Sequence, residues 1–318
     1  MAGDTYPADQ SQAALRLFLR WFGAQYARST RGAEQQESEG LLEAVIRVGR
    51  EWTLSARVVN TLSGEADLAF ETARAAIERR LDAEGKSLAL WVPRGAVLPD
   101  AEPRISEIIA ATDTPATVPD GRGELRMPVT LHLRRVDTTG SVITILGGLG
   151  ASWAQFTNRV PGSFQLNSLE LHRLPADPAE REALAERIVL AAAQPDVDES
   201  LRIPAEDAWT VNDLEAGGSC VLGSPRPDND EQSAALRRNL RLLLKDAQAR
   251  PRPEADARAL IVLGAATYAD EEKLSWALRG MDPTLYSGYD LILIVADGMV
   301  KSLLQPGRQT LPWDAPAG

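Results

Sequence analysis

The apolar residues near the C-terminus fall into two unbroken runs, at 259–263 and 291–296. Continuous apolarity, rather than alternation, is typical of strands covered on both faces, as in a parallel sheet flanked by helices. Residues 270–279, between the two runs, have helical composition, and the connection is long enough for a right-handed strand–helix–strand unit. The pattern therefore predicts an α/β sheet flanked by helices in this part of the chain.

Helical periodicity marks several other stretches. Apolar residues at helical spacing predict helices over 11–26 and 67–83, and Gly85 is suited to end the second. Residues 41–60 are also periodic enough for a helix, although 52–59 fits a strand equally well, and the polar residues 28–40 are predicted to be a loop. The first 85 residues are therefore predicted to be mainly helical. Further helices are predicted at 104–111, 151–158, 178–194 and 230–248.

The middle of the chain changes to alternating apolar and polar residues. Residues 127–136 alternate, 137–140 are suited to a turn, and 141–146 return, which together predict a β-hairpin. Residues 195–207 are acidic and contain prolines, so they are predicted to be a linker or a domain edge. Further strands are predicted at 87–92, 164–174, 209–213 and 219–223.

These elements predict a mixed α/β (α+β) protein made of consecutive regions. A helical N-terminal region (1–85) precedes a β-rich middle region (86–176). An α/β domain (177–304) follows, and the Pro- and Gly-bearing residues 305–318 are expected to form a flexible tail.

Composition narrows the class of protein. The formal net charge is −11, which disfavours a general nucleic-acid coat or a binder of anionic membranes. Cys220 is the only cysteine, so an intrachain disulfide and a cysteine-rich zinc site are excluded. Residues 1–12 lack the basic and apolar segments of a signal peptide. The chain is therefore expected to be a soluble cytoplasmic protein without a membrane partner.

The predicted order of elements over 180–300 is helix, two strands joined by a turn, helix, strand, helix and strand. This order resembles the core of the restriction-endonuclease-like (PD-(D/E)xK) nucleases. In that family an Asp ends one strand, and a Glu/Asp-x-Lys triplet on the next strand completes a Mg²⁺ site. Carboxylates supply the hard oxygen ligands, and the Lys orients or activates water. Asp213 matches the family's Asp, but the next predicted strand, 219–223, contains neither an acidic residue nor a lysine.

Carboxylates at the start of the following helix give two interpretations. Asp228, Asp230 and Glu231 are suited to cap the helix N-terminus. The alternative is a Mg²⁺-dependent nuclease that combines Asp213 with one of these migrated carboxylates. Because the catalytic triplet is incomplete, the leading hypothesis is a non-catalytic scaffold or recognition subunit that needs no cofactor. Its expected partners are other protein subunits, in an assembly for DNA processing or defence.

The same helix also has a basic side. Arg237, Arg241 and Lys245 are spaced i, i+4, i+8, and Arg238 lies beside them, opposite a row of leucines. Such a row is a candidate for contact with the phosphates of a nucleic acid. It also fits an ordinary solvent-exposed helix face.

A glycine-rich segment follows the strand predicted at 141–146. Gly147, Gly148, Gly150 and Ser152 stand where backbone N–H groups hold phosphate in nucleotide-binding proteins. These residues are the basis of a third hypothesis, a nucleotide or small-molecule binder. The other interpretation is a tight turn that packs closely against its neighbours.

Overall fold

A computed structural model describes most of the chain. The described residues are 10–38, 41–61, 68–93, 95–117, 122–150, 156, 158–194, 196, 198–223, 233–250, 253–264, 278–305 and 311–314. They belong to two compact units: unit 1 comprises Met1–Ala89 and Asp213–Gly318, and unit 2 comprises Leu90–Asn212. Both units combine helices with strands, which confirms the mixed α/β class. The predicted division into consecutive regions differs from this arrangement, because unit 1 is assembled from both ends of the chain.

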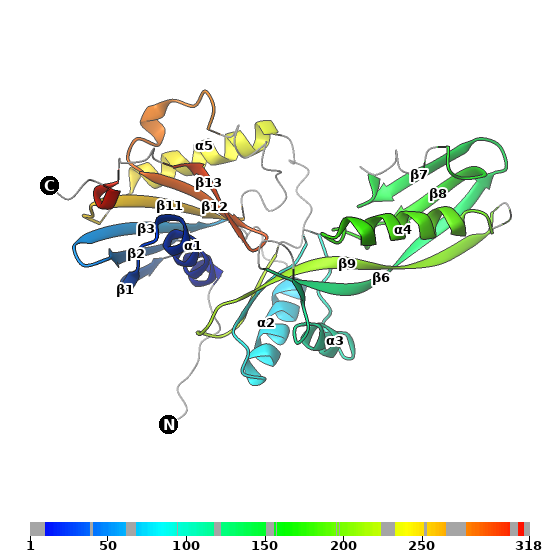
Figure 1. Ribbon diagram of the computed structural model, residues 1–318, viewed down its shortest axis with the longest axis horizontal. Coiled ribbons are helices and arrows are strands. Elements are labelled where there is room, and N and C mark those ends of the chain that lie inside the picture. Colours follow the sequence, from blue (N-terminus) through cyan, green and yellow to red (C-terminus); the bar gives the residue numbers. More distant parts are fainter. Residues whose placement is uncertain are drawn as a thin grey trace. The chain divides into compact units, whose positions relative to one another are not determined.

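Unit 1 is organised around a six-stranded mixed sheet in the order β1-β2-β3-β11-β12-β13 (Figure 1). The strands are β1 (Thr30–Ser38), β2 (Leu41–Val48), β3 (Trp52–Asn60), β11 (Ala257–Leu263), β12 (Leu291–Ala296) and β13 (Met299–Leu304). The first three strands form an antiparallel meander, and β11 pairs in parallel with both β3 and β12. The parallel pairing of the two apolar runs is therefore confirmed. The helix predicted between them lies outside the described residues.

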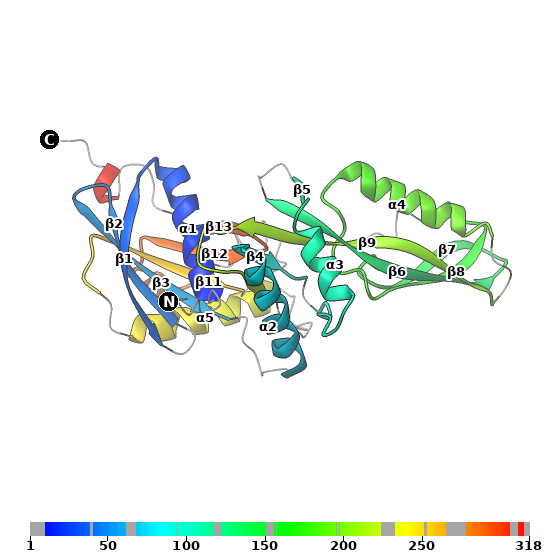
Figure 2. The same ribbon diagram turned by 90° about the horizontal axis from the view of Figure 1, so that it is seen from below.

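Two helices explain why these central strands are apolar on both faces. Helix α1 (Gln10–Tyr26) and helix α5 (Ser233–Ala249) lie on opposite faces of the sheet (Figure 2). Leu240 and Leu244 of α5 pack against Leu260 and Val262 of β11. Successive residues of a strand alternate between faces, so Ile261 points toward the α1 side. The predicted helices at 11–26 and 230–248 are confirmed over their described residues.

The prediction of a mainly helical N-terminal region is wrong. The expected loop at 28–40 contains β1, and the expected helix at 41–60 is the hairpin of β2 and β3. The alternative strand at 52–59 is correct. Leu42, Ala44, Ile46 and Val48 are buried at period two, which is the burial of a strand. The apolar residues between them also satisfied helical spacing, so periodicity alone did not distinguish the two structures.

Helix α2 (Leu68–Ala83) and the short strand β10 (Cys220–Leu222) complete unit 1. The predicted strands 209–213 and 219–223 do not pair directly as a hairpin, because the chain around residue 87 lies between Leu214 and Ser219. The Leu214 amide donates to the Ser87 carbonyl at 2.8 Å, and the Ser219 hydroxyl donates to the Lys86 carbonyl at 3.0 Å. Strand β4 (Leu88–Trp91) follows and contains the boundary between the two units.

Unit 2 contains a long antiparallel ribbon of β6 (Gly123–Asp137) and β9 (Ser200–Asp213), shown in Figures 1 and 2. The two strands pair without interruption from Gly123 opposite Val211 to Arg134 opposite Ser200. The predicted linker at 195–207 is therefore wrong from residue 200 onward. Arg202, Pro204 and Glu206, which suggested a linker, lie on the exposed side of β9, while Ile203, Ala205 and Asp207 are buried.

The predicted hairpin of 127–136 and 141–146 is wrong in its pairing. Strand β8 (Gly162–Ser168) lies between β6 and β7 (Ser141–Gly147), so the sheet order is β9-β6-β8-β7. Strand β8 runs antiparallel to β6 and parallel to β7. The connection at 137–140 therefore joins β6 to β7 past the end of β8, which lies between them. The pattern of a single segment located the strands correctly, but it contained no information about a third strand between them.

One face of this sheet is covered by α4 (Pro178–Ala191). Leu184 and Ile188 of the helix pack against Leu131, Phe164 and Ile203 of the strands. The predicted helix at 178–194 is confirmed, as are α3 (Arg104–Ala111) and strand β4. The prediction for 164–174 was too long, because β8 ends at Ser168, and Leu169 after it is 62% exposed. The helix predicted at 151–158 lies largely outside the described residues.

Part of the predicted flexible tail is packed. Trp313 is buried, its ring lies 5.4 Å from that of Phe22 of α1, and its carbonyl accepts a hydrogen bond from Arg28 at 2.6 Å. This short segment therefore belongs to the core of unit 1. Among the helices that the structure describes, none is long and apolar enough to cross a lipid bilayer.

Candidate functional site

A buried ion pair lies on the α5 side of the sheet in unit 1, where β2 and β3 are adjacent. Glu43 of β2 and Arg57 of β3 are direct cross-strand partners. Arg57 is only 3% exposed. Its Nε donates to Glu43 Oε1 at 2.5 Å, and its Nη2 contacts the same carboxylate oxygen. The guanidinium therefore binds the carboxylate through two nitrogens.

The third nitrogen of this guanidinium fixes the end of α5. Arg57 Nη1 donates to the Ala247 carbonyl at 2.5 Å, and the Tyr289 hydroxyl lies 3.4 Å from the same oxygen. Helix α5 ends at Ala249, so this carbonyl is among the last four, which have no partner within a helix. A buried guanidinium needs such partners because removing a charge from water is costly. Arg57 thus connects β2, β3 and α5.

Ser55 is a second buried polar residue on this face of β3. It lies two residues before Arg57, on the same face of β3, and is 7% exposed. Ser55 and Arg57 therefore share the face of β3 on which Glu43 of β2 lies opposite Arg57. A guanidinium has five N–H donors and no acceptor, so Arg57 can hold the Glu43 carboxylate but cannot serve as a general base.

Asp213, the predicted metal ligand, stabilises a turn. Its carboxylate accepts the Glu215 amide at 2.7 Å, and its backbone carbonyl accepts Arg20 Nη2 at 2.7 Å. The other predicted carboxylates, Asp228, Asp230 and Glu231, lie outside the described residues. Within the described ranges, no three His, Cys, Asp or Glu side chains are grouped so that they could hold a metal ion.

The basic residues of α5 face solvent. Arg237, Arg238, Arg241 and Lys245 are exposed, while Leu240 and Leu244 lie in the core. This row of basic residues lies beside the segment that begins at residue 278. Hydrogen bonds from Thr284 lower the pKa of the Asp282 carboxyl, and the charge of Arg241 contributes in the same direction. Part of the positive charge of the row is thus already balanced within unit 1.

The glycine-rich segment forms a tight turn at the end of β7. The Gly148 amide donates to the Ser168 carbonyl at 3.2 Å, and a Cβ at Gly148 would overlap the Leu171 carbonyl oxygen. The backbone at Gly147 has φ +101°, which favours glycine. Close packing therefore accounts for both glycines. A Cβ at Gly150 would meet no atom of the described residues within 4 Å, and Ser152 lies outside those residues.

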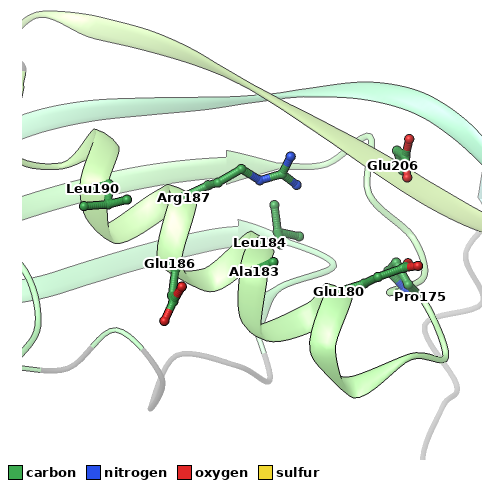
Figure 3. Close-up of a pocket in the computed structure, with 8 residues that line it drawn as sticks. All are labelled: Pro175, Glu180, Ala183, Leu184, Glu186, Arg187, Leu190 and Glu206. Carbon is green, nitrogen blue, oxygen red and sulfur yellow. The ribbon is translucent and has the colours of Figure 1, made fainter.

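Unit 2 contains a pocket of about 430 Å³ between α4 and β9, shown in Figure 3. Its lining residues are Pro175, Glu180, Ala183, Leu184, Glu186, Arg187, Leu190 and Glu206. At one end Arg126 lies among carboxylates: its Nη2 is 2.7 Å from Glu180 Oε2, and its Nε is 4.0 Å from Glu206 Oε2. This end is therefore an ion-paired network that joins three elements of unit 2.

Of the buried carboxylates that were not recognised in the sequence, two lie in β9 and α2. Asp207 of β9 accepts the amides of His172 and Arg173, at 2.9 and 2.7 Å, and the indole N–H of Trp209 at 3.0 Å. Glu78 of α2 accepts the Val221 amide at 2.9 Å. Both satisfy backbone N–H groups of a neighbouring segment, so their role is structural. An acidic residue at an otherwise buried position of a strand or helix is the signal that could have identified them.

Comparisons of the chain with protein-family models, curated proteins and solved structures found no match.

Proposed function

We propose that this protein is a non-catalytic recognition or scaffold subunit of a larger cytoplasmic assembly for DNA processing or defence. We further propose that unit 1 is a nuclease-like unit in which an ion pair stands in place of the metal site. The observation that carries the proposal is the buried contact of Glu43 with Arg57, which also holds the end of α5.

The proposal places the nuclease resemblance on β2, β3 and α5 instead of on the strands that the sequence suggested. The family pattern is an acidic residue on one strand and an acid-x-lysine triplet on the next, followed by a basic helix. In unit 1 the adjacent strands that carry a comparable arrangement are β2 and β3, with Glu43 opposite Arg57 of the triplet Ser55-Ala56-Arg57. A serine stands in place of the triplet's carboxylate and an arginine in place of its lysine. The basic helix is α5, which the same arginine binds.

The chemistry of these residues suits a structural ion pair and does not suit hydrolysis of nucleic acid at a Mg²⁺ site. A Mg²⁺ ion needs several oxygen ligands around an accessible space. The Glu43 carboxylate is already neutralised by a cation inside the sheet, and Ser55 contributes only a hydroxyl. The positive residues of α5 remain exposed, and they supply a surface that could follow a nucleic-acid backbone while partner subunits perform the chemistry.

A cleavage assay tests the catalytic part of the proposal. Purified protein is incubated with supercoiled plasmid and Mg²⁺ or Mn²⁺, beside Glu43→Ala and Asp213→Ala variants. We expect the three proteins to give the same background. Metal-dependent cleavage that is lost in Asp213→Ala would instead support the nuclease that uses Asp213. Cleavage lost in a Glu43→Ala protein whose unit 1 stays folded by hydrogen exchange would show that the ion pair opens to bind metal, and would equally overturn the proposal.

The recognition part needs a separate measurement. Affinity purification of the tagged full-length chain from its native host, followed by mass spectrometry, should recover defined subunits in stoichiometric amounts. Binding of a DNA duplex should weaken in Arg237→Glu/Arg241→Glu relative to the charge-matched control Arg104→Glu/Arg181→Glu in unit 2. A chain that purifies alone and binds DNA equally in both variants would contradict this part of the proposal.

A further inference from the structure

We propose that strand β7 is a self-association site, at which two copies of the chain pair edge to edge. This inference is independent of the proposed function, because it rests on unit 2 alone. Strand β7 is the last strand of its sheet and pairs on one side with β8. Among the strands that the structure describes, none pairs with its other edge.

The residues of β7 lack the features that normally protect an edge strand. Charged side chains, prolines and bulges are the usual protection. Strand β7 reads Ser-Val-Ile-Thr-Ile-Leu-Gly, without a charge or a proline. The edge strands of the sheet in unit 1 differ, since β1 carries Arg31 and Glu34 and β13 carries Lys301. The edge of β7 is therefore suited to accept another strand.

The outward backbone groups lie at the centre of β7. The Leu146 carbonyl accepts the Ser168 hydroxyl at 2.9 Å, and the Gly148 amide donates to the Ser168 carbonyl, so both point toward β8. These groups alternate in direction along a strand. Those of Ser141, Ile143 and Ile145 therefore point to the outer edge. The Ser141 carbonyl accepts the Asn158 amide at 3.1 Å, whereas no strand within the described part of the chain pairs with Ile143 and Ile145 on this edge.

The sequence of β7 is complementary to itself when two copies run antiparallel about Thr144. In that register Ile143 lies opposite Ile145 of the second copy, and the two exchange backbone hydrogen bonds. Val142 lies opposite Leu146 on the exposed face, where these side chains are 42% and 45% exposed. Thr144 lies opposite its own copy. Apolar and Thr–Thr cross-strand pairs of this kind stabilise antiparallel sheets.

Charge favours this contact over others between two copies. Each chain carries a formal net charge of −11, so most of its surface repels a second copy. Strand β7 adds no like-charge contact. Its seven residues are far fewer than the roughly 20–30 residues per partner of a stable interface. The expected complex is therefore a weak dimer that forms with increasing concentration.

Sedimentation of the full-length chain over a micromolar concentration series tests for the dimer. Thr144→Lys places two ammonium groups opposite each other, and we expect it to raise the dimer dissociation constant roughly two- to fivefold. The matched control is Thr114→Lys, at an exposed residue of unit 2 outside β7. A wild-type chain that stays monomeric throughout, or a dimer unaffected by Thr144→Lys, would overturn the proposal.

A cysteine variant tests the register directly. Residues that face each other without backbone hydrogen bonds have Cα atoms about 4.5 Å apart, within the range of a disulfide. Thr144→Cys should therefore give a covalent dimer on mild oxidation, whereas Thr114→Cys should not. The native Cys220 is buried and should not react. Equal cross-linking of the two variants would show that pairing does not centre on Thr144.

Discussion

Replacement of Arg57 by methionine tests how far the ion pair supports unit 1. Methionine keeps much of the side-chain volume but removes the charge and all of its donors. The substitution leaves the Glu43 carboxylate inside the sheet without its cation. It also leaves the Ala247 carbonyl, at the end of α5, without its shortest hydrogen bond.

The expected cost follows from these contacts. Two unit charges about 4 Å apart attract by about 4 kcal/mol at an effective dielectric constant near 20, and removal of one partner of a buried pair costs about 3–5 kcal/mol. Glu43 retains 18% exposure of its side chain, which lets water stabilise part of the orphaned charge. We therefore expect Arg57→Met to lower the free energy of unfolding of unit 1 by about 3 kcal/mol, the lower end of that range.

Hydrogen exchange measured by mass spectrometry is the suitable assay, because a protein with two units need not unfold in one step. Exchange protection of β3 and β11 reports on unit 1, while protection of β6 and β9 serves as an internal control. The double variant Glu43→Leu/Arg57→Met removes both charges. It should recover much of the lost stability, since apolar replacement of a whole buried pair is often neutral.

The reasoning would be refuted by either of two results. One is a loss of less than about 1 kcal/mol in Arg57→Met, which would place the pair in the range of solvent-exposed ion pairs. The other is additivity, in which the double variant is destabilised by the sum of the two single variants.

Three further predictions concern packing and buried charge. Gly148→Ala should destabilise unit 2 by about 1–3 kcal/mol, because its Cβ would overlap the Leu171 carbonyl; unchanged exchange of β7 and β8 would contradict this. Trp313→Ala should cost about 3–5 kcal/mol in unit 1, measured by the same exchange experiment, and a frayed C-terminus would predict almost none. Burial raises the pKa of the Glu78 carboxyl above its ordinary value of 4.5, so the ionised form opposes folding as pH rises through this range. The stability of Glu78→Gln relative to wild type, compared by urea unfolding, should therefore rise from about pH 4 to pH 7, and a constant difference would exclude this effect.

The sequence predicted elements best where one pattern had one interpretation. The apolar runs that became β11 and β12, and the capped helix α4, were located with nearly correct ends. Strand β13 was missed, although the preceding Asp297-Gly298 is a strong hairpin signal and both residues have positive φ.

Pairing between distant segments could not be predicted in this way. The position of β8 between β6 and β7 depends on side-chain packing beneath α4 and on the turn at 158–161. Neither is contained in the alternation of 127–146. The Glu43–Arg57 pair was missed for the same reason, because residues 41–60 also fitted a helix. A helix would have placed the two side chains more than three turns apart, whereas the hairpin places them opposite each other.

The division of unit 1 between the two ends of the chain has a consequence during synthesis. Strand β3 pairs in parallel with β11, whose residue Ala257 lies opposite Leu54, so about 200 residues must be translated before this pairing can form. Unit 2 is continuous in sequence, and its strands have emerged from the ribosome by then. We therefore expect unit 2 to fold first on the nascent chain. Until β11 emerges, the β3 edge of the meander of β1, β2 and β3 has no partner strand. Chaperones that bind nascent chains should engage this protein at residues 41–60 until β11 has emerged.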